Sequence, residues 1–497
     1  MRMCSTAKIP IASLIAAAVT VMGQASSPQT GAHDGVARVI SGLVAALNSK
    51  SESVMTQFVN SNLVSNAPVE QRVKRWMGLA ENGAPFKIVR ELEWSNDQST
   101  SILVDRLGNR IALISHFEAQ PRVKLLGIQL APAYTREGLA PELANWTNLA
   151  NLSAKIAKKS QAPAMGIAMI RRGVPSEVAT GVTKVGGKIH VLPGQVWSIG
   201  SIGKPLCATV IGRLIELGRL RWNETLKEAL PSVAMNSDCA QITLEQLMHH
   251  RGGIRPDLGF KEAEVRAIVG EAKSPSQIRA NYGRDILKQK PVVPPGSQFI
   301  YSNAGYAVLS LVAEKAYGKS YEQILKDLVF KPLGLDHSFT GTDKLPTARP
   351  SGHTDDGYKL TPQDATGPME FMFAGAGGGI YMSVGDLARF GQAHLIGLNG
   401  KDGFMKAATV LRLHSGEAEG QRLPRKYACG WGIETLPNME PFHGHNGSNG
   451  TMRAELAIFP SAGLVVAAAV NRGGEAEPSP AMEAVLAIGA RYAPRSK

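Results

Sequence analysis

A serine and a lysine three residues apart stand where a strand-like run passes into a helical pattern, at Ser201 and Lys204. Positions i and i+3 are neighbours on a helix, so Lys204 can bring its amine to the Ser201 hydroxyl. A serine attacks only when a base takes its proton, and desolvation can lower the pKa of a lysine enough for it to serve. Ser5 and Lys8 share the spacing by chance. The prediction of a nucleophilic serine therefore depends on the strand-to-helix context and on two further motifs.

The chain contains one Tyr-x-Asn sequence, at Tyr301 and Asn303, between a Pro-Pro-Gly run and a helical pattern over 304–317. This context predicts an ordered loop at a helix start. A phenol held among cations can ionise or relay protons, and the Asn303 amide can bond both the lysine and a substrate carbonyl. Alone, the pair fits a buried tyrosine beside a helix-capping asparagine equally well, so the catalytic interpretation requires the other motifs.

A third motif, His445, Asn446 and Gly447, precedes Ser448 and a strand-like run over 453–459. Gly447 would let a substrate lie close to the strand. The backbone N–H of Ser448, together with that of Ser201, would form an oxyanion hole. We expect the His445 side chain beside the cleft, where a carboxylate or carbonyl of the substrate would lie.

Two neighbouring histidines, His443 and His445, raise the alternative of a metal site. Zinc sites use three or four protein ligands, and the chain has no HExxH sequence and no third ligand at a useful spacing. The sequence therefore predicts no metal and no organic cofactor.

The motifs occur in an order that resembles the serine β-lactamase and penicillin-binding protein family, specifically its class C β-lactamase and DD-peptidase branch. The resemblance covers about residues 162–493 and is carried by these runs: GRLRWNETLKEALP, ITLEQLMHHRGGI, PPGSQFIYSNAGY, KPLGLDHSF, AGGGIYMSVGDLARF, YACGWGI and GHNGSNGTMRAELAIFP. It implies that Ser201 is acylated, that Lys204 and Tyr301 share the base role, and that Asn303 orients the substrate. It also implies that His445, Asn446 and Gly447 form the third motif.

Two departures from the family's pattern bear on the substrate. Class C β-lactamases typically have Lys-Thr-Gly where this chain has His-Asn-Gly, and many relatives have Thr-Ser-Gly where it has Arg251, Gly252 and Gly253. The first departure removes a permanent cation that would hold the carboxylate of a β-lactam, and so favours peptidase or esterase relatives. The second is a loop variation.

The expected function is that of an exported serine hydrolase that cleaves an amide or ester bond through an acyl-serine intermediate. A D-amino-acid peptide, an ester and a β-lactam all remain open as substrates. The GxSxG elbow of α/β-hydrolases is absent, which excludes that class. The alternative is a catalytically silent protein that acts as a binding or scaffold module. A silent protein of this kind would be indicated by the loss of a residue from one of the three motifs, and this chain retains all of them.

The first 25 residues have the pattern of a cleaved signal peptide. Arg2 and Lys8 precede an apolar run over 9–22, and small residues stand at 23 and 25. The mature protein is therefore expected in the periplasm or outside the cell. It stays basic after cleavage, which allows association with anionic cell-envelope polymers. No nucleic-acid motif accompanies the charge, and no later apolar run is long enough for a membrane span.

Two domains are expected within 497 residues, because a single core stops growing well below that length. Residues 32–131 combine two helical stretches with an antiparallel meander, which turns at Gly108 and Asn109. This α+β order is weakly similar to NTF2-like and cystatin folds. Residues 141–497 are the expected β-lactamase-like hydrolase domain, of α/β (α+β) class: an antiparallel sheet flanked by helices, plus a helical subdomain.

Within the second domain, strand patterns at both ends of the chain enclose long helical patterns. The helices are expected over 141–160, 210–220 and 304–317, and strands over 165–170 and 177–182. After signal cleavage three cysteines remain, an odd number without metal-ligand spacing, at Cys207, Cys239 and Cys429. This count favours buried free thiols over a disulfide framework.

Overall fold

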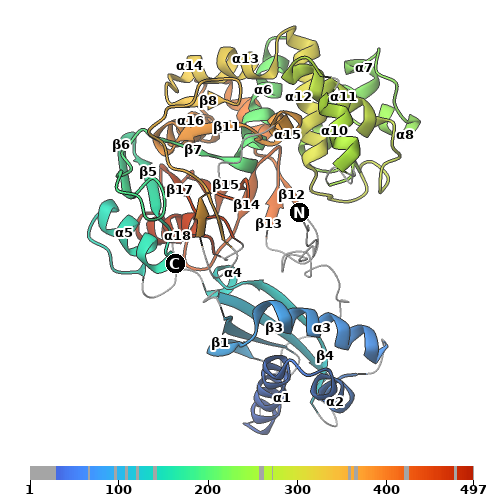
Figure 1. Cartoon of the computed structure of the whole chain (residues 1–497), viewed down its shortest axis with the longest axis vertical. Coiled ribbons are helices and arrows are strands. Elements are labelled where there is room, and N and C mark those ends of the chain that lie inside the picture. Colours follow the sequence, from blue (N-terminus) through green and yellow to red (C-terminus); the bar gives the residue numbers. More distant parts are fainter. Residues whose placement is uncertain are drawn as a thin grey trace. The chain divides into compact units, whose positions relative to one another are not determined.

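The computed structural model describes residues 30–64, 68–94, 98–106, 110–118, 123–137, 143–256, 262–270, 272–355, 360–362, 368–418, 425–474 and 478–495. The predicted signal peptide, residues 1–25, and the predicted turn at Gly108 and Asn109 lie outside these segments. The chain divides into two units, Met1–Ala140 with Glu475–Pro478 and Pro141–Gly474 with Ser479–Lys497 (Figure 1).

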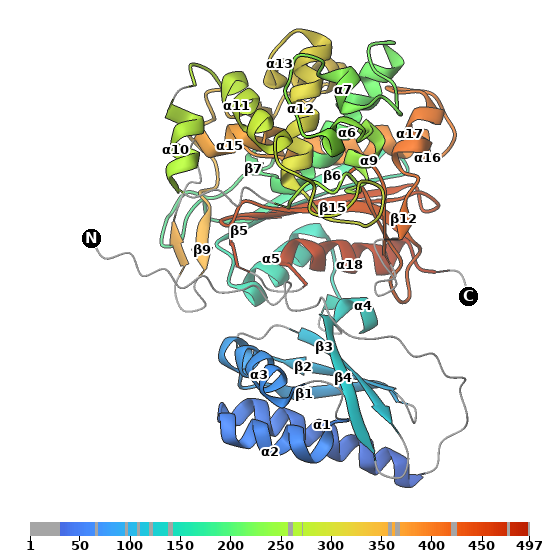
Figure 2. The same ribbon diagram turned by 90° about the vertical axis from the view of Figure 1, so that its right-hand side faces the viewer.

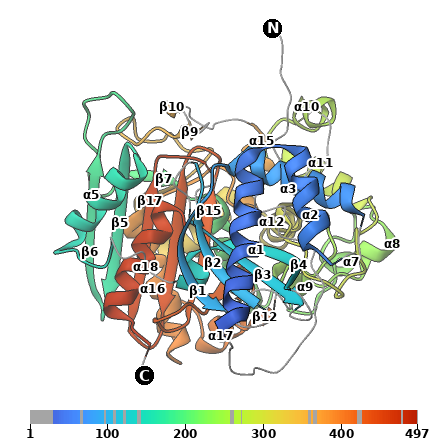
Figure 3. The same ribbon diagram turned by 90° about the horizontal axis from the view of Figure 1, so that it is seen from below.

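The first unit packs helices against one face of an antiparallel sheet of order β1-β2-β3-β4, with α1 lying across the strands (Figure 3). Its elements are α1 (Thr30–Ser49), α2 (Glu52–Asn62), α3 (Val69–Gly83), β1 (Lys87–Trp94), β2 (Gln98–Val104), β3 (Arg110–Glu118), β4 (Lys124–Pro132) and α4 (Tyr134–Glu137). Leu47, Phe58, Trp76 and Leu113 contribute to the shared core. The sequence pattern misses α2, because its 11 residues bury only three side chains and show little periodicity.

The second unit is built on an eight-stranded antiparallel sheet of order β12-β13-β14-β15-β16-β17-β5-β6. Its strands come from both ends of the domain, as predicted: β5 (Ala164–Arg171), β6 (Val174–Gly181), β12 (Glu417–Ala418), β13 (Arg425–Tyr427), β14 (Gly432–Glu434), β15 (Phe442–Ser448), β16 (Arg453–Phe459) and β17 (Leu464–Val470). Helices α5 (Leu149–Ser160) and α18 (Pro480–Tyr492) cover one face, and α16 (Val384–Leu398) packs on the other (Figure 2). Strands β16 and β17 are therefore buried along their whole length.

A helical subdomain and small sheets complete the second unit. The remaining helices are α6 (Gly203–Glu216), α7 (Leu226–Ala229), α8 (Ser237–Ala240), α9 (Leu244–Met248), α10 (Glu262–Gly270), α11 (Pro275–Leu287), α12 (Asn303–Tyr317), α13 (Tyr321–Leu325), α14 (Lys331–Leu333), α15 (Pro368–Met372) and α17 (Ala407–Leu413), with short turns η3 (Gly200–Ile202), η4 (Lys326–Phe330) and η5 (Ala374–Ala376). The small sheets join β7 (Val196–Ser198), β11 (Ile380–Ser383) and β8 (Ser338–Thr340), and β9 (His353–Asp355) with β10 (Leu360–Pro362). The predicted fold class is confirmed.

Two predicted helices have different ends in the structure, and capping explains both. Helix α6 ends at Glu216 rather than at 220, because Gly218 adopts a φ of 70°. The amides of Gly218 and of the residue after it donate to carbonyls in the last turn, which is a Schellman motif. Helix α5 begins later than the predicted residue 141, because the Asn148 side chain caps it.

The three cysteines Cys207, Cys239 and Cys429 are free and buried, as the sequence pattern predicts. Burial raises the pKa of the Cys207 thiol to about 12 and that of the Cys239 thiol to about 11. Since the thiolate is the reactive form, these thiols are inert at neutral pH. Among the residues that the structure describes, no helix is long and apolar enough to cross a membrane.

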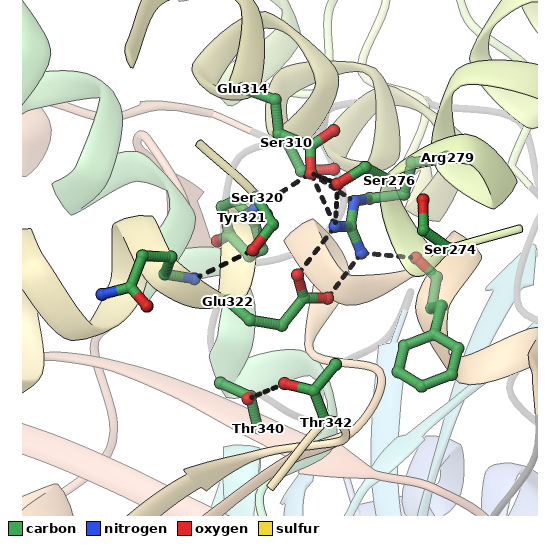
Figure 4. A network of polar contacts seen from close by, with 12 residues as sticks. Ser274, Ser276, Arg279, Ser310, Glu314, Ser320, Tyr321, Glu322, Thr340 and Thr342 are labelled. Atoms are coloured by element: carbon green, nitrogen blue, oxygen red, sulfur yellow. Dashed lines mark hydrogen bonds and ion pairs between the residues drawn. The ribbon is translucent and has the colours of Figure 1, made fainter. Parts of the chain in front are cut away.

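A buried ion-pair network ties the helical subdomain together (Figure 4). The Arg279 side chain on α11 has no exposed surface and donates to Glu314 on α12 at 2.6 Å and to both carboxylate oxygens of Glu322 on α13 at 2.7 and 2.9 Å. It also donates to the Phe371 carbonyl on α15 at 3.3 Å. One guanidinium thus connects four helices.

Replacing Arg279 with methionine should lower the free energy of unfolding by about 3–5 kcal/mol, because two buried carboxylates lose their cation. The matched control lies on the same helix: Arg284 is 47% exposed and pairs with Asp285 at 3.2 Å. Arg284→Met should cost less than about 1 kcal/mol. Urea unfolding of both variants makes the comparison, and equal losses would show that the Arg279 network contributes no more than a surface pair.

Candidate active site

Ser201 lies in the turn η3, between β7 and the first residue of α6, as the strand-to-helix context predicts. The turn is held closely on both sides by backbone. Gly200 adopts a φ of 50°, and a Cβ there would lie 2.4 Å from the Ser448 nitrogen on β15. A Cβ on Gly203 would lie 2.1 Å from the Gly377 Cα, in the loop after η5. Only glycine fits these two positions. The serine turn can therefore lie directly against the backbone of Ser448 on one side and of Gly377 on the other.

Lys204 lies in the first turn of α6, and its side chain meets the serine in the predicted way. The residue has no exposed surface. Its Nζ is 3.0 Å from Ser201 Oγ and 2.7 Å from Asn303 Oδ1. The i, i+3 spacing therefore brings an amine to the hydroxyl, and an element about a hundred residues further along the chain holds that amine in place.

Asn303 is the first residue of α12, and a neighbouring side chain performs the capping. Ser302 is the N-cap, with its hydroxyl accepting a hydrogen bond from the Gly305 amide at 2.9 Å. Since Ser302 caps the helix, the Asn303 side chain can bond Lys204 instead. The alternative of a helix-capping asparagine is therefore excluded.

Tyr301 precedes this cap and presents its ring to the lysine. Lys204 Nζ lies 4.6 Å from the centre of the Tyr301 ring and 5.8 Å from that of Tyr306. Aromatic faces stabilise a cation at such distances. The buried amine is thus surrounded by the serine hydroxyl, an amide oxygen and two phenol rings.

The third motif approaches the serine turn through its glycine. A Cβ on Gly447 would lie 1.8 Å from the Ile199 carbonyl oxygen and 3.0 Å from the Ser201 nitrogen. Gly447 therefore makes room for the backbone of the serine turn. The same close approach sets the backbone of Ser448 beside η3, which is where an oxyanion hole would need it.

His445 is placed differently from the sequence-based expectation. The residue is only 2% exposed, and both ring nitrogens bond protein atoms. Its Nδ1 donates to the Asn446 carbonyl at 2.5 Å, and its Nε2 then accepts from the Tyr427 hydroxyl at 2.9 Å. The ring lies 6.3 Å from that of Tyr301. The His445 nitrogens are thus turned toward β13 and the strand's own backbone, so the expected contact with a substrate carboxylate would require one of these two bonds to break.

Asn446 and Ser448 alternate with His445 along β15, so their side chains point to the opposite face of the strand. Both residues are exposed, and their backbone partners on β16 are Glu455 for Asn446 and Arg453 for Ser448. The structure therefore brings together the side chains of Ser201, Lys204, Tyr301, Asn303 and His445. Asn446 does not join them through its side chain, and Ser448 and Gly447 contribute backbone only.

Two residues near the site have no role in the sequence-based prediction, His250 and Tyr427. His250 lies 4.4 Å from the Tyr301 ring, and Tyr427 bonds His445. Both occur in runs that carry the family resemblance, ITLEQLMHHRGGI and YACGWGI. Membership in those runs was the sequence feature that could have indicated a role for His250 and Tyr427. Only the folded chain shows what the two side chains contact.

A row of hydrogen-bonded imidazoles connects α6 with β15. The Thr209 hydroxyl donates to the Pro205 carbonyl at 2.8 Å, so it accepts from His394 Nε2 at 3.0 Å. His394 Nδ1 then accepts from His414 Nε2 at 3.0 Å, and His414 Nδ1 accepts from His443 Nδ1 at 3.1 Å. Each ring is therefore held as a single neutral tautomer. Among the described residues, no group of three or more His, Cys, Asp or Glu could hold a metal ion.

Burial keeps these three histidines neutral. It lowers the pKa of His443 to about 4 and that of His394 to about 3. Burial and then the neighbouring His443 and His394 rings lower the pKa of His414 well below its usual value. Histidines of an unfolded chain bind protons below about pH 6.5, whereas these do so only at much lower pH. Unfolding therefore takes up protons in acid.

We accordingly expect the free energy of unfolding to fall as the pH drops below about 6.5, with His443 alone contributing a loss of roughly 3 kcal/mol by about pH 4. His443→Gln should flatten this decline, because the amide can still donate to His414 but does not titrate. The measurement is urea unfolding of both proteins from neutral pH down to about pH 4.5. Identical slopes would mean that His443 titrates normally in the folded protein.

The fold and the serine–lysine–tyrosine cluster define a serine hydrolase, and comparison with known proteins agrees. The family model described as Beta-lactamase matches residues 149–491, so the chain belongs to the beta-lactamase family. Penicillin-binding protein 4 of Amycolatopsis lactamdurans is 28% identical over 321 residues, which are 63% of this chain and 81% of that protein. The chain spans only 39% of some other curated relatives, such as Protein flp of Staphylococcus aureus.

Solved structures also resemble this chain. The octameric penicillin-binding protein homologue from Pyrococcus abyssi has a TM-score of 0.56 and 25% identity, covering 67% of this chain and 75% of that one. A D-stereospecific amidohydrolase from Streptomyces has a TM-score of 0.55 and 20% identity, covering 66% of this chain and 95% of that one. The second likeness shows the fold alone.

Proposed function

We propose that this hydrolase cleaves an amide or ester bond through an acyl intermediate on Ser201. The observation that carries the proposal is the buried Lys204 amine, 3.0 Å from Ser201 Oγ and 2.7 Å from Asn303 Oδ1. A hydroxyl becomes a nucleophile when a base within hydrogen-bond reach accepts its proton. Lys204 Nζ meets this distance requirement, and Asn303 fixes its position.

In the acylation step, Ser201 Oγ attacks the carbonyl carbon while its proton passes to Lys204 Nζ. The bond from the carbonyl carbon to the leaving nitrogen or oxygen then breaks, and that atom receives the proton through Tyr301. In deacylation, water attacks the acyl carbon by the reverse route and restores the serine hydroxyl. The sum is one water consumed for each amide or ester cleaved. The backbone N–H groups of Ser201 and Ser448 would hold the oxyanion.

The strand pairing of β15 is evidence for an extended, peptide-like substrate. Strand β14 pairs with residues 442–444 of β15, and none of the described strands pairs with that edge of residues 446–448. A free strand edge offers backbone donors and acceptors that an extended peptide can use. The unpaired stretch lies next to the serine turn, so a bound peptide would run past Ser201.

The burial of His445 favours substrates without a carboxylate at this position. A permanent cation in the third motif would attract a carboxylate, whereas both ring nitrogens of His445 are hydrogen-bonded to protein atoms. We therefore propose esters and amides of D-amino acids ahead of β-lactams as the substrate class. The resemblance of the sequence motifs to the DD-peptidase branch supports the choice of D-amino acids.

The test compares kcat/KM for an N-acetyl-D-alanyl-D-alanine, its methyl ester at the C-terminus, the L,L form of that ester, and a penicillin. The neutral D,D ester should be the best of the four, and the penicillin should acylate the enzyme slowly. A preference for the free carboxylate over its ester would overturn the proposed substrate class. Equal rates for the D,D and L,L esters would overturn the stereochemical part alone.

We also propose that the protein is exported, on the strength of the basic and apolar pattern in residues 1–25. A basic mature protein would then lie near anionic cell-envelope polymers. N-terminal sequencing of the protein from its native host should give Ser26 as the first residue. Recovery of the full chain starting at Met1 would contradict export by cleavage.

A further inference from the structure

His250 occupies an unusual backbone position just beyond α9. It is 2% exposed, and its φ is 57°, in the left-handed region. Such a conformation is uncommon for a residue with a side chain and persists only where the surroundings hold it. The His250 amide donates to the Leu247 carbonyl at 3.0 Å, so the chain reverses direction there. This turn directs both the His250 carbonyl and its ring toward the loop before α12.

That loop is fastened to His250 on both sides of Tyr301. The Ile300 amide donates to the His250 carbonyl oxygen at 2.8 Å. The Ser302 amide donates to His250 Nδ1 at 3.0 Å. The residues before and after Tyr301 are therefore both bonded to one residue, once through its backbone and once through its ring. Because Nδ1 accepts, the proton of the neutral imidazole is on Nε2.

The His250 ring also packs against the rings that surround the lysine. Its centre lies 4.4 Å from that of Tyr301, 5.0 Å from that of Tyr306 and 4.9 Å from that of Tyr427. Two of these, Tyr301 and Tyr306, are the rings that Lys204 Nζ approaches. The third holds His445 through its hydroxyl. One imidazole therefore contacts three of the tyrosines that shape the site.

We infer that His250 is a positioning residue, which holds Tyr301 at the distance from Lys204 that proton transfer requires. It acts through the Ser302 bond and the ring contact. Displacing a catalytic group by about 1 Å can cost on the order of a hundredfold in rate. The inference rests on the proposed function, in which Tyr301 relays protons between Lys204 and the leaving group.

Two substitutions of similar size separate the hydrogen bond from the packing. Asparagine places its carbonyl oxygen close to where Nδ1 lies and tolerates left-handed backbone. Glutamine puts its amide near Nε2 and leaves no hydrogen-bond acceptor at the Nδ1 position. We expect His250→Gln to lower kcat by about ten- to hundredfold with little change in KM, and His250→Asn to retain most of the activity. Melting temperatures are recorded for both variants, because loss of packing should lower both alike.

A double-mutant cycle with Tyr301→Phe decides whether His250 acts through the phenol. With the hydroxyl already removed, His250→Gln should change kcat by no more than about twofold. Equal factors in the two backgrounds, with Tyr301→Phe itself impaired, would overturn the inference but leave the proposed function in place. A fully active Tyr301→Phe would overturn the proposed role of Tyr301 first. If His250→Gln does not fold, amide hydrogen exchange in the unaltered protein decides, since a fast-exchanging Ser302 amide would contradict the bond.

Discussion

Ser201→Ala should abolish turnover of ester and amide substrates, by up to on the order of a millionfold if the residues of the site act as a unit. The oxygen that forms the acyl bond is then missing, and Lys204 has no hydroxyl to deprotonate. The fold should survive, because Ser201 is only half-buried and an alanine fits the turn. The measurement is kcat/KM on a chromogenic ester, with melting temperature recorded in parallel.

The control for this variant is a serine outside the site. Ser176 is exposed on the edge strand β6, and Ser176→Ala should leave kcat/KM unchanged. Substantial activity in Ser201→Ala would mean that another residue is the nucleophile. In that case the serine–lysine contact would be structural, and the assignment of the site would have to be abandoned.

Lys204→Met is expected to have the second largest effect, a loss in kcat on the order of a thousandfold to ten-thousandfold, as for other positioned general bases. Methionine keeps the length and apolar stem of the side chain but has no proton acceptor of useful strength. The side chain is fully buried, so the substitution also removes the cost of burying an amine. We therefore expect the melting temperature to stay the same or rise while activity is lost.

A loss of activity without a loss of thermal stability distinguishes a catalytic lysine from a structural one. Lys158→Met, on the exposed side of α5, is the matched control and should change neither quantity. A Lys204→Met protein that melts early and loses activity in proportion to its unfolded fraction would contradict the base role. A stable variant with nearly full activity would do so as well.

The parts of the site that depend on local spacing were predictable from the sequence. Ser201 and Lys204 are one helical turn apart, and Tyr301 and Asn303 lie at the start of a single helix, so short-range geometry and the family resemblance were sufficient. The antiparallel sheet with helices on both faces followed from apolar strand patterns at both ends of the domain. Helix ends were less accurate, because the cap at Asn148 was not recognised.

The parts that depend on contacts distant in sequence could not be predicted. Strand alternation puts His445 on the same face of β15 as Gly447. The sequence does not indicate that the Tyr427 hydroxyl lies on that face and bonds the His445 ring. The close approach of the Ile199 backbone to Gly447 is a contact of the same kind, since about 250 residues separate the two in the sequence. His250 carries no signal beyond its place in a family-like run, because its two bonds reach across about fifty residues.

The most direct test of the central claim is mass spectrometry of the acyl-enzyme. The protein is mixed with a D-alanyl ester, quenched in acid within the first turnovers, and analysed intact and after proteolysis. We predict a mass increase equal to the acyl group, located on the peptide that contains Ser201, which disappears when the reaction runs to completion. Rapid turnover with no adduct, or an adduct on a peptide lacking Ser201, would contradict an acyl-serine mechanism at this site.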